Sequence, residues 1–260
     1  MDDMAKRFFI TQHPTFGSYA NPIKSKIEKS PYFYWFKALT LNDDYVEYCA
    51  NPSNNRFETN DSIHQVYKDF GDVRHEGCVY LAFTQWWIEK INELDTRGTY
   101  LFAEPFTGTK VEIVTNGSDA TNAANDESVL LIRIPKIINR KRIDEAIDRI
   151  LASEMQFERG RKVRNPSRSN ARYHLSKPVK VESLKEAFEV YELERDAKTN
   201  DTKISNLKLA KAVGIEVQQK KTYEQAQDYS YQSELINTKV WRRKKLAKDA
   251  IANVIKGKFV

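Results

Sequence analysis

Apolar side chains recur at helical spacing through most of this chain, and polar stretches separate the segments that carry them. In the region 22–50, Ser30 is a preferred N-cap residue and Pro31 suits the first position of a helix. Trp35, Leu39 and Tyr45 or Val46 could then share one helical face. The same periodicity predicts further helices at 78–94, 141–154, 181–197, 204–216 and 237–260.

Two short segments follow a strand pattern instead. Residues 109–115 alternate apolar and polar side chains, and 128–135 is a continuous apolar run that ends at Pro135. The polar stretch 116–126 between them is expected to be an exposed loop. The predicted fold class is therefore α+β and mainly helical. A small two-stranded unit would lie between an aromatic helical half and a basic, helix-turn-helix-like helical half.

Charge is distributed unevenly along the chain. Residues 1–128 hold 12 Lys/Arg against 19 Asp/Glu, a net charge of −7, whereas residues 129–260 hold 30 against 17, a net charge of +13. Such a division is typical of a chain with a nucleic acid or another anionic partner, although two charged faces that neutralise each other would also produce it. We expect an acidic, aromatic-rich helical region with the first strand at 1–128, and a basic DNA-binding region at 129–260.

The cellular setting is indicated by what the sequence lacks. Cys49 and Cys78 are too few for a disulfide framework and favour a reducing compartment. No window approaches the roughly 18 consecutive apolar residues of a membrane span. The opening MDDMAKRFFITQHP has neither the apolar core nor the cleavage site of a signal peptide. A cytoplasmic location without a membrane partner is expected.

The segment LKLAKAVGI (207–215) resembles the first helix and turn of a helix-turn-helix. Ala210 would permit a close helix crossing and Gly214 would occupy a turn position with positive φ. Leu209, Val213 and Ile215 would fill a small core.

The residues after this segment depart from the usual pattern. Lys220 and Lys221 stand near the position where the second helix normally has an apolar residue. Either 204–216 is an ordinary helix that ends at a glycine, or the turn carries an insertion and the reading helix comes later. The helix-turn-helix-like region is accordingly placed at 204–256.

The last predicted helix offers a recognition surface. Thr238 is an N-cap candidate, and Ala247, Ala250 or Ile251, and Val254 form an inward stripe. Its first turns are crowded with cations, which can contact guanine edges and phosphates in a major groove. The alternative is a solvated charged face, which normally mixes both signs. The predicted contact residues in this helix are Lys239, Arg242, Arg243, Lys244, Lys245 and Lys248.

A second basic element is the segment 159–180, which has eight Lys/Arg, two prolines and no acidic residue. It is predicted to be an arm that follows the phosphate backbone, the alternative being a linker with incidental charge. The contact residues predicted outside the last helix are Arg159, Arg161, Lys162, Arg164, Arg168, Arg172, Lys208, Lys211, Lys220 and Lys221.

The aromatic clusters lie in the acidic half. The run from Tyr32 to Phe36 could stack on exposed bases, but a polyanion is unfavourable in an acidic region. Core packing or an interface with a protein partner is the expected role, both for this run and for Trp86 and Trp87.

No catalytic motif is recognisable. FGDV (70–73) lacks the other elements of a kinase, and the four histidines are scattered. One loose cluster of metal-ligand types is typical of exposed loop residues. No catalytic residue, metal or cofactor is predicted, and an enzyme is not expected. The cluster consists of His64, Asp69, Asp72, His75 and Glu76.

The chain also resembles an uncharacterised family of proteins from bacterial genomes and mobile elements. The similarity covers SPYFYWF, YKDFGDV, LFAE, VLLIRIP, ARYHLS and LKEAFEVYELERD, and ends in KLAKDAIANVIKGKF. This resemblance implies a DNA-associated protein of a phage or plasmid with a helix-turn-helix-like end, and it assigns no catalytic residue. The closing pattern corresponds to Ala247, Ile251, Asn253, Val254, Gly257 and Phe259.

These observations predict a DNA-binding protein that acts as a regulator or accessory factor of a mobile element or phage. Its expected partner is nucleic acid, with double-stranded DNA favoured. A structural or assembly component of a nucleoprotein complex is the alternative. A nuclease is the third hypothesis, but the basic half offers no evident group of acidic residues beside a basic one.

Overall fold

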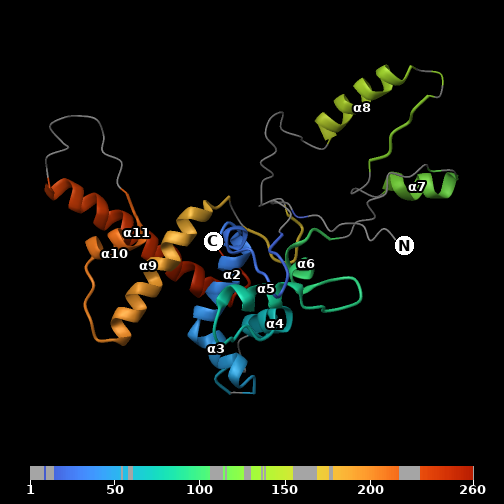
Figure 1. Cartoon of the computed structure of the whole chain (residues 1–260). Helices are drawn as coiled ribbons and strands as arrows, with labels where there is room; N and C mark the ends of the chain where they lie inside the picture. The colour runs from blue at the N-terminus through green and yellow to red at the C-terminus, as the bar shows by residue number, and fades with distance from the viewer. Residues whose placement is uncertain are drawn as a thin grey trace. The chain divides into compact units, whose positions relative to one another are not determined.

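The computed structural model (Figure 1) describes residues 9, 15–53, 55–57, 61–105, 114, 116–125, 130–135, 137, 139–154, 169–175, 178–216 and 229–259. This part of the chain is mainly helical, as predicted. Its helices are α1 (Lys24–Ile27), α2 (Pro31–Leu41), α3 (Asp43–Ala50), the 3-10 helix η1 (Asn55–Phe57), α4 (Asp61–Phe70), α5 (Val79–Ile88), α6 (Arg97–Phe102), α7 (Gly117–Asn125), α8 (Arg140–Glu154), α9 (Val181–Thr199), α10 (Asn206–Val213) and α11 (Tyr229–Val254).

The chain divides into two compact units. The first consists of Met1–Glu104 and Asn165–Val260, and the second of Pro105–Arg164. The boundary expected near residue 128 falls inside the second unit. The larger unit therefore combines the acidic beginning of the chain with its basic end.

Asn42 determines how the first long helical segment is divided. Ser30 caps α2 as predicted, because its hydroxyl accepts a hydrogen bond from the amide of Tyr32. The helix does not continue through the segment, since the side chain of Asn42 accepts from the amide of Tyr45, at 2.9 Å, and starts α3. The same side chain donates to the carbonyl of Ile251, at 2.7 Å. This carbonyl lies in the last turn of α11, where no amide of the helix can satisfy it.

The aromatic run from Tyr32 to Phe36 forms the centre of the core, which confirms the core-packing prediction. Trp35 is fully buried and stacks on Phe259, with ring centroids 5.2 Å apart. Tyr173 packs edge-on against Trp35, at 5.9 Å. Residues from both ends of the chain thus fill one core, since its other members include Phe70, Phe102, Leu184, Phe188, Ile251 and Val254.

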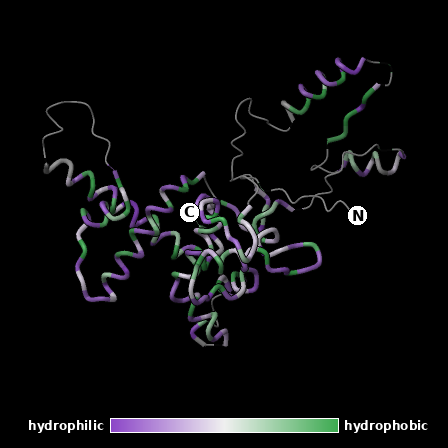
Figure 2. The backbone as a smooth tube through the Cα atoms, viewed as in Figure 1, coloured by the Kyte–Doolittle hydropathy of each residue, from purple (hydrophilic) through white to green (hydrophobic). Residues whose placement is uncertain are grey.

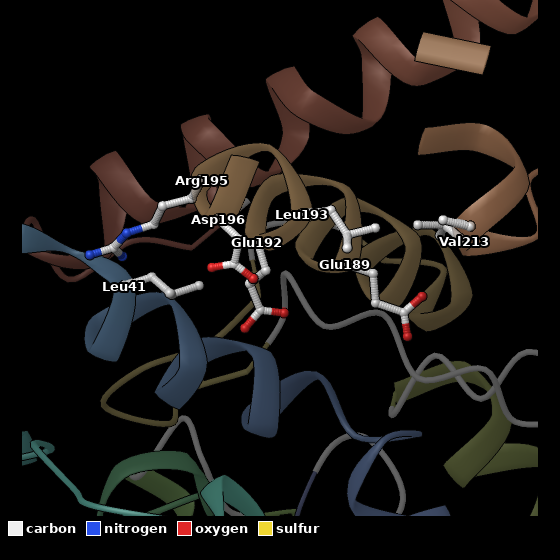
Figure 3. Close-up of a pocket in the computed structure, with 8 residues that line it drawn as sticks. Leu41, Glu189, Glu192, Leu193, Arg195, Asp196 and Val213 are labelled. Carbon is white, nitrogen blue, oxygen red and sulfur yellow. The ribbon is translucent and has the colours of Figure 1, made fainter. Parts of the chain in front are cut away.

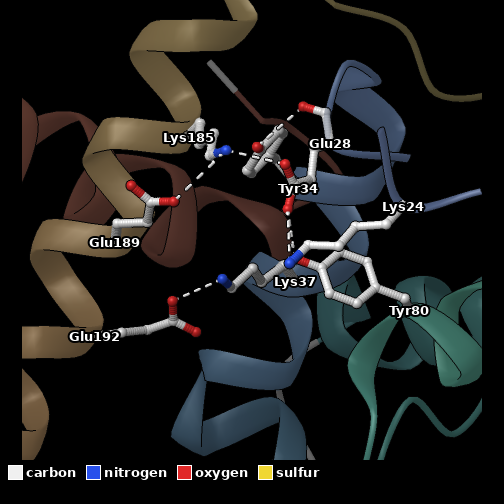
Figure 4. A network of polar contacts seen from close by, with 8 residues as sticks. All are labelled: Lys24, Glu28, Tyr34, Lys37, Tyr80, Lys185, Glu189 and Glu192. Carbon is white, nitrogen blue, oxygen red and sulfur yellow. Dashed lines mark hydrogen bonds and ion pairs between the residues drawn. The ribbon is translucent and has the colours of Figure 1, made fainter. Parts of the chain in front are cut away.

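A polar network attaches α9 to the first helices (Figure 4). Glu28 accepts hydrogen bonds from Tyr80, at 2.7 Å, and from Lys185 of α9, at 2.9 Å. Lys37 of α2 pairs with Glu192 of α9 at 2.6 Å. Burial alone would raise the pKa of Glu28, but these donors and the charges of Lys185 and a neighbouring lysine outweigh it and lower that pKa below its usual range.

A smaller core joins α9, α10 and α11. Val190 of α9, Leu209 and Ala210 of α10, and Val240 of α11 are buried together with Ile215. At the end of α10, Gly214 adopts the left-handed conformation with φ of 73°, as predicted for the turn position. The predicted roles of Leu209 and Ile215 as core residues are confirmed, and Val213, the third predicted core residue, is partly buried against the same cluster.

The two-stranded unit is not found among the described residues. Residues 130–135, which are mainly hydrophobic in Figure 2, form no strand. Most of the other candidate, 109–115, lies outside the described residues. In the described part, β-pairing is limited to two isolated bridges, between Gly17 and Pro22 and between Lys90 and Thr96.

The prediction of a loop at 116–126 is wrong, because Gly117–Asn125 form helix α7. Asn116 begins this helix, since its side chain accepts from the hydroxyl of Ser118 at 2.8 Å and its carbonyl accepts from the amide of Ala120. Alanines, which have the highest helix propensity, continue it. The following helix, α8, confirms the prediction for 141–154 and alternates hydrophilic and hydrophobic residues (Figure 2).

Two other predicted boundaries are wrong. Helix α5 ends at Ile88 instead of residue 94, because Asn92 accepts from the amides of Leu94 and Asp95 and forms a turn. Helix α11 begins at Tyr229, so Thr238 lies inside it and is not an N-cap.

Gly98 allows a close contact between α5 and α6. Any Cβ at this position would overlap the indole ring of Trp87, so we expect Gly98→Ala to destabilise the protein by about 1–3 kcal/mol. The matched control is Gly117→Ala, where nothing lies within 4 Å of the new methyl group. Urea denaturation checks this, and equal stability of the two variants would show that the contact is not tight.

The Glu28 network makes stability depend on pH. Because the folded pKa of Glu28 is lowered from 4.5, its contribution is present above pH 4.5 and is lost as the pH falls through the folded value. Glu28→Gln should therefore be less stable than the parent at pH 7, and the difference should shrink on acidification below about pH 4. Thermal unfolding as a function of pH measures this. A control at the exposed Glu76, Glu76→Gln, should show no such difference.

Candidate nucleic-acid interface

Helix α11 has one buried side. Ala247, Ala250, Ile251 and Val254 are buried, which confirms the inward stripe predicted for this helix, and the buried Val240 extends it. The C-terminal part of this stripe packs in the aromatic core and the N-terminal part packs against α9 and α10. Because an α-helix has 3.6 residues per turn, burial of this stripe determines which residues of α11 lie on the side that faces away from the core.

Two of the predicted contact residues flank the buried side and are held by α9. The guanidinium Nε of Arg243 lies 2.6 Å from a carboxylate oxygen of Glu186. The Lys244 Nζ lies 2.9 Å from a carboxylate oxygen of Glu194 and 3.0 Å from the side-chain oxygen of Asn206. All of these charged side chains are partly buried. Arg243 and Lys244 therefore attach α11 to the rest of the protein.

The outward side of α11 carries cations of a different kind. Arg242, Lys245 and Lys248 are exposed, and among the described residues none of the three takes part in an ion pair. Trp241 lies among them, with the Lys245 Nζ 5.6 Å from its ring centroid. We call these four residues the cationic face of α11. Asp249 is the one acidic residue at the exposed positions between Thr238 and Ala252.

Helix α10 brings two more predicted contact residues close to α11. Lys208 and Lys211 are exposed on this helix. Its first residue, Asn206, donates to the side chain of Asn237 of α11 at 3.0 Å. The remaining predicted cation of α11, Lys239, donates to the backbone carbonyl of Glu216 and keeps its charge near the surface.

The helix-turn-helix itself stays a prediction. Its first helix and the Gly214 turn are present, but the segment that would hold the second helix, 217–228, lies outside the described residues. Lys220 and Lys221 belong to that segment. The same applies to most of the arm, namely Arg159, Arg161, Lys162, Arg164 and Arg168.

Arg172 is the described member of the predicted arm contacts, and it is bound internally. Its Nη1 lies 3.3 Å from each carboxylate oxygen of the buried Asp69, and its guanidinium lies 4.5 Å from the ring centroid of Tyr100. The hydroxyl of Tyr173 donates to Asp69 at 2.8 Å. Burial, followed by this hydrogen bond, raises the pKa of Tyr173. A buried carboxylate is costly unless it is paired, so the main role of Arg172 is to pair with Asp69.

The loose cluster of metal-ligand types does not come together. Asp69 belongs to the network around Arg172, and Asp72 pairs with Arg74 at 2.6 Å. His64 lies 2.5 Å from the hydroxyl of Tyr48, and His75 stacks on Phe36. Within the described ranges, no group of three or more His, Cys, Asp or Glu could hold a metal ion.

A pocket of about 570 Å³ lies between α2, α9 and α10 (Figure 3). Carboxylates of α9 point into it, including Glu189, Glu192 and Asp196. Burial raises the pKa of Glu189, and the charges of Lys185 and Lys37 only partly oppose this shift. A nucleic-acid backbone would be repelled here. The other lining residues are Leu41, Leu193, Arg195, Ala212 and Val213.

Comparison of the chain with protein-family models, curated proteins and solved structures finds no match. The family resemblance of the sequence therefore stays a hypothesis. None of the described helices combines the length and the apolar character needed to cross a bilayer.

The two kinds of cation on α11 predict different effects on stability. Arg243→Ala leaves the partly buried Glu186 without its partner and should destabilise the protein by about 1–2 kcal/mol. Arg242→Ala, one position away, should change the free energy of unfolding by less than about 0.5 kcal/mol. Urea denaturation compares the two variants. Equal destabilisation would contradict the assignment of Arg243 to the fold and of Arg242 to the surface.

Proposed function

We propose that this protein binds DNA, with double-stranded DNA as the primary ligand, through the cationic face of α11. The observation that supports this proposal most strongly is the difference between the two sides of the helix. Inward cations such as Arg243 and Lys244 have carboxylate partners on α9. Outward cations such as Lys245 and Lys248 have no ion pair among the described residues.

Cations that lie on one helical face without anionic partners repel one another. A polyanion laid along the face would remove this repulsion and release its own counterions, which is the main source of affinity in non-specific DNA binding. Lys208 and Lys211 on α10 add positive charge near α11. Base reading by this part of α11 would fall to Arg242, because Arg243 is held by Glu186.

A role as regulator or accessory factor of a mobile element or phage is implied by the sequence resemblance and is part of this proposal. The second candidate is an assembly component of a nucleoprotein complex. The acidic and apolar pocket beside α9 favours it, since such a lining suits a basic segment of a protein partner.

The test is to remove the three charges of the face together. Changing Arg242, Lys245 and Lys248 to Gln should weaken duplex binding at least about tenfold. The slope of log K against log salt is negative, and its magnitude should fall by about 0.9 for each phosphate that the protein no longer neutralises. Fluorescence anisotropy with a labelled duplex at several salt concentrations measures both quantities.

The matched control removes the same charge from the acidic part of the chain. Lys29, Lys68 and Lys90 are exposed, and changing all three to Gln should leave affinity and salt slope close to those of the parent. If both triple variants bind equally weakly, binding is a property of net charge and not of α11. If the parent binds no oligonucleotide, the assembly component becomes the better proposal.

A further inference from the structure

Trp241 is the tryptophan that the core does not use. Trp35, Trp86 and Trp87 are at most 6% exposed, whereas 59% of Trp241 is exposed. It stands among three cations, and the Lys245 ammonium lies near its ring. A large aromatic side chain left in water within a cationic surface is the combination that proteins use to bind nucleic-acid strands with unstacked bases.

The start of α10 extends this surface. Asn206 bonds to both Asn237 and Lys244 of α11, and Trp241 lies about one helical turn from each of them. The residue after Asn206 is Leu207, which is 56% exposed. Helix α10 therefore also carries an exposed apolar side chain, next in sequence to the residue that contacts α11.

We propose that this surface binds single-stranded nucleic acid, with an unpaired base stacked on the indole of Trp241 and the backbone phosphates on Arg242, Lys245 and Lys248. This inference rests on the proposed function, in which the same cations bind a duplex, and it adds single-stranded nucleic acid as a second ligand of this surface. In a duplex both faces of each base are already stacked, so the indole has no partner there. In a single strand the base face is free, and Lys245 can leave the ring for a phosphate.

The stacking contribution can be separated from the charge contribution. Base–aromatic stacking is worth about 1–3 kcal/mol per base, so Trp241→Ala should lower affinity for a single-stranded oligo(dT) by about tenfold. Trp241→Phe keeps an aromatic ring and should recover part of this loss. Affinity for a duplex of the same length should change less than about twofold in both variants. Because Trp241 is exposed, neither variant should alter the melting temperature.

Tryptophan fluorescence gives a second readout. Since the other three tryptophans are buried, oligo(dT) should quench mainly the emission of Trp241, and this quenching should disappear in Trp241→Phe. A decrease in duplex and single-strand affinity to the same extent in Trp241→Ala would overturn the stacking proposal and leave DNA binding intact. If Trp241→Ala binds both ligands as tightly as the parent does, the stacking proposal is also overturned and DNA binding is left intact. Absence of binding to every oligonucleotide would overturn both proposals.

Discussion

The exposure of the basic side chains of α11 depends on how the C-terminal end of this helix is buried. Ala250, Ile251 and Val254 pack into the aromatic core, and Asn42 donates to the carbonyl of Ile251. Phe259, just beyond the helix, stacks on Trp35. Because a helix is rigid over this length, these contacts fix the rotation of α11 about its axis. They therefore decide which basic side chains meet α9 and which meet solvent.

This constraint gives the cations of the last helix two different roles. Arg243 and Lys244 are neighbours of Arg242 and Lys245 in the sequence, yet they lie on the side that faces Glu186 and Glu194. Their charge is neutralised inside the protein and contributes to holding two helices together. The positive charge that the described part of α11 offers to a partner is thus smaller than the sequence suggests, and it lies on one face beside an exposed tryptophan.

Local patterns predicted several helices, with errors at α7 and at two boundaries, and did not predict the long-range partners. Ser30 with Pro31 marked the start of α2, and the Gly214 turn was predicted, because capping and left-handed conformations depend on neighbouring residues. Arg243 and Glu186 are 57 positions apart in the sequence, so their pairing depends on how the two helices that carry them pack together. The strand prediction for 128–135 is not confirmed, since its described part, residues 130–135, forms no strand, and apolar composition alone does not determine strand pairing.

If nucleic acid lies on the outward cationic face of α11, as we propose, it should protect the lysines there, and lysine acetylation in the presence and absence of an oligonucleotide tests this most directly. Lys245 and Lys248 should react rapidly in the free protein and become protected in the complex. Lys244, which Glu194 and Asn206 already bind, should react slowly in both states. Protection of Lys29 and Lys68 in the acidic part, with Lys245 and Lys248 still reactive, would contradict this account.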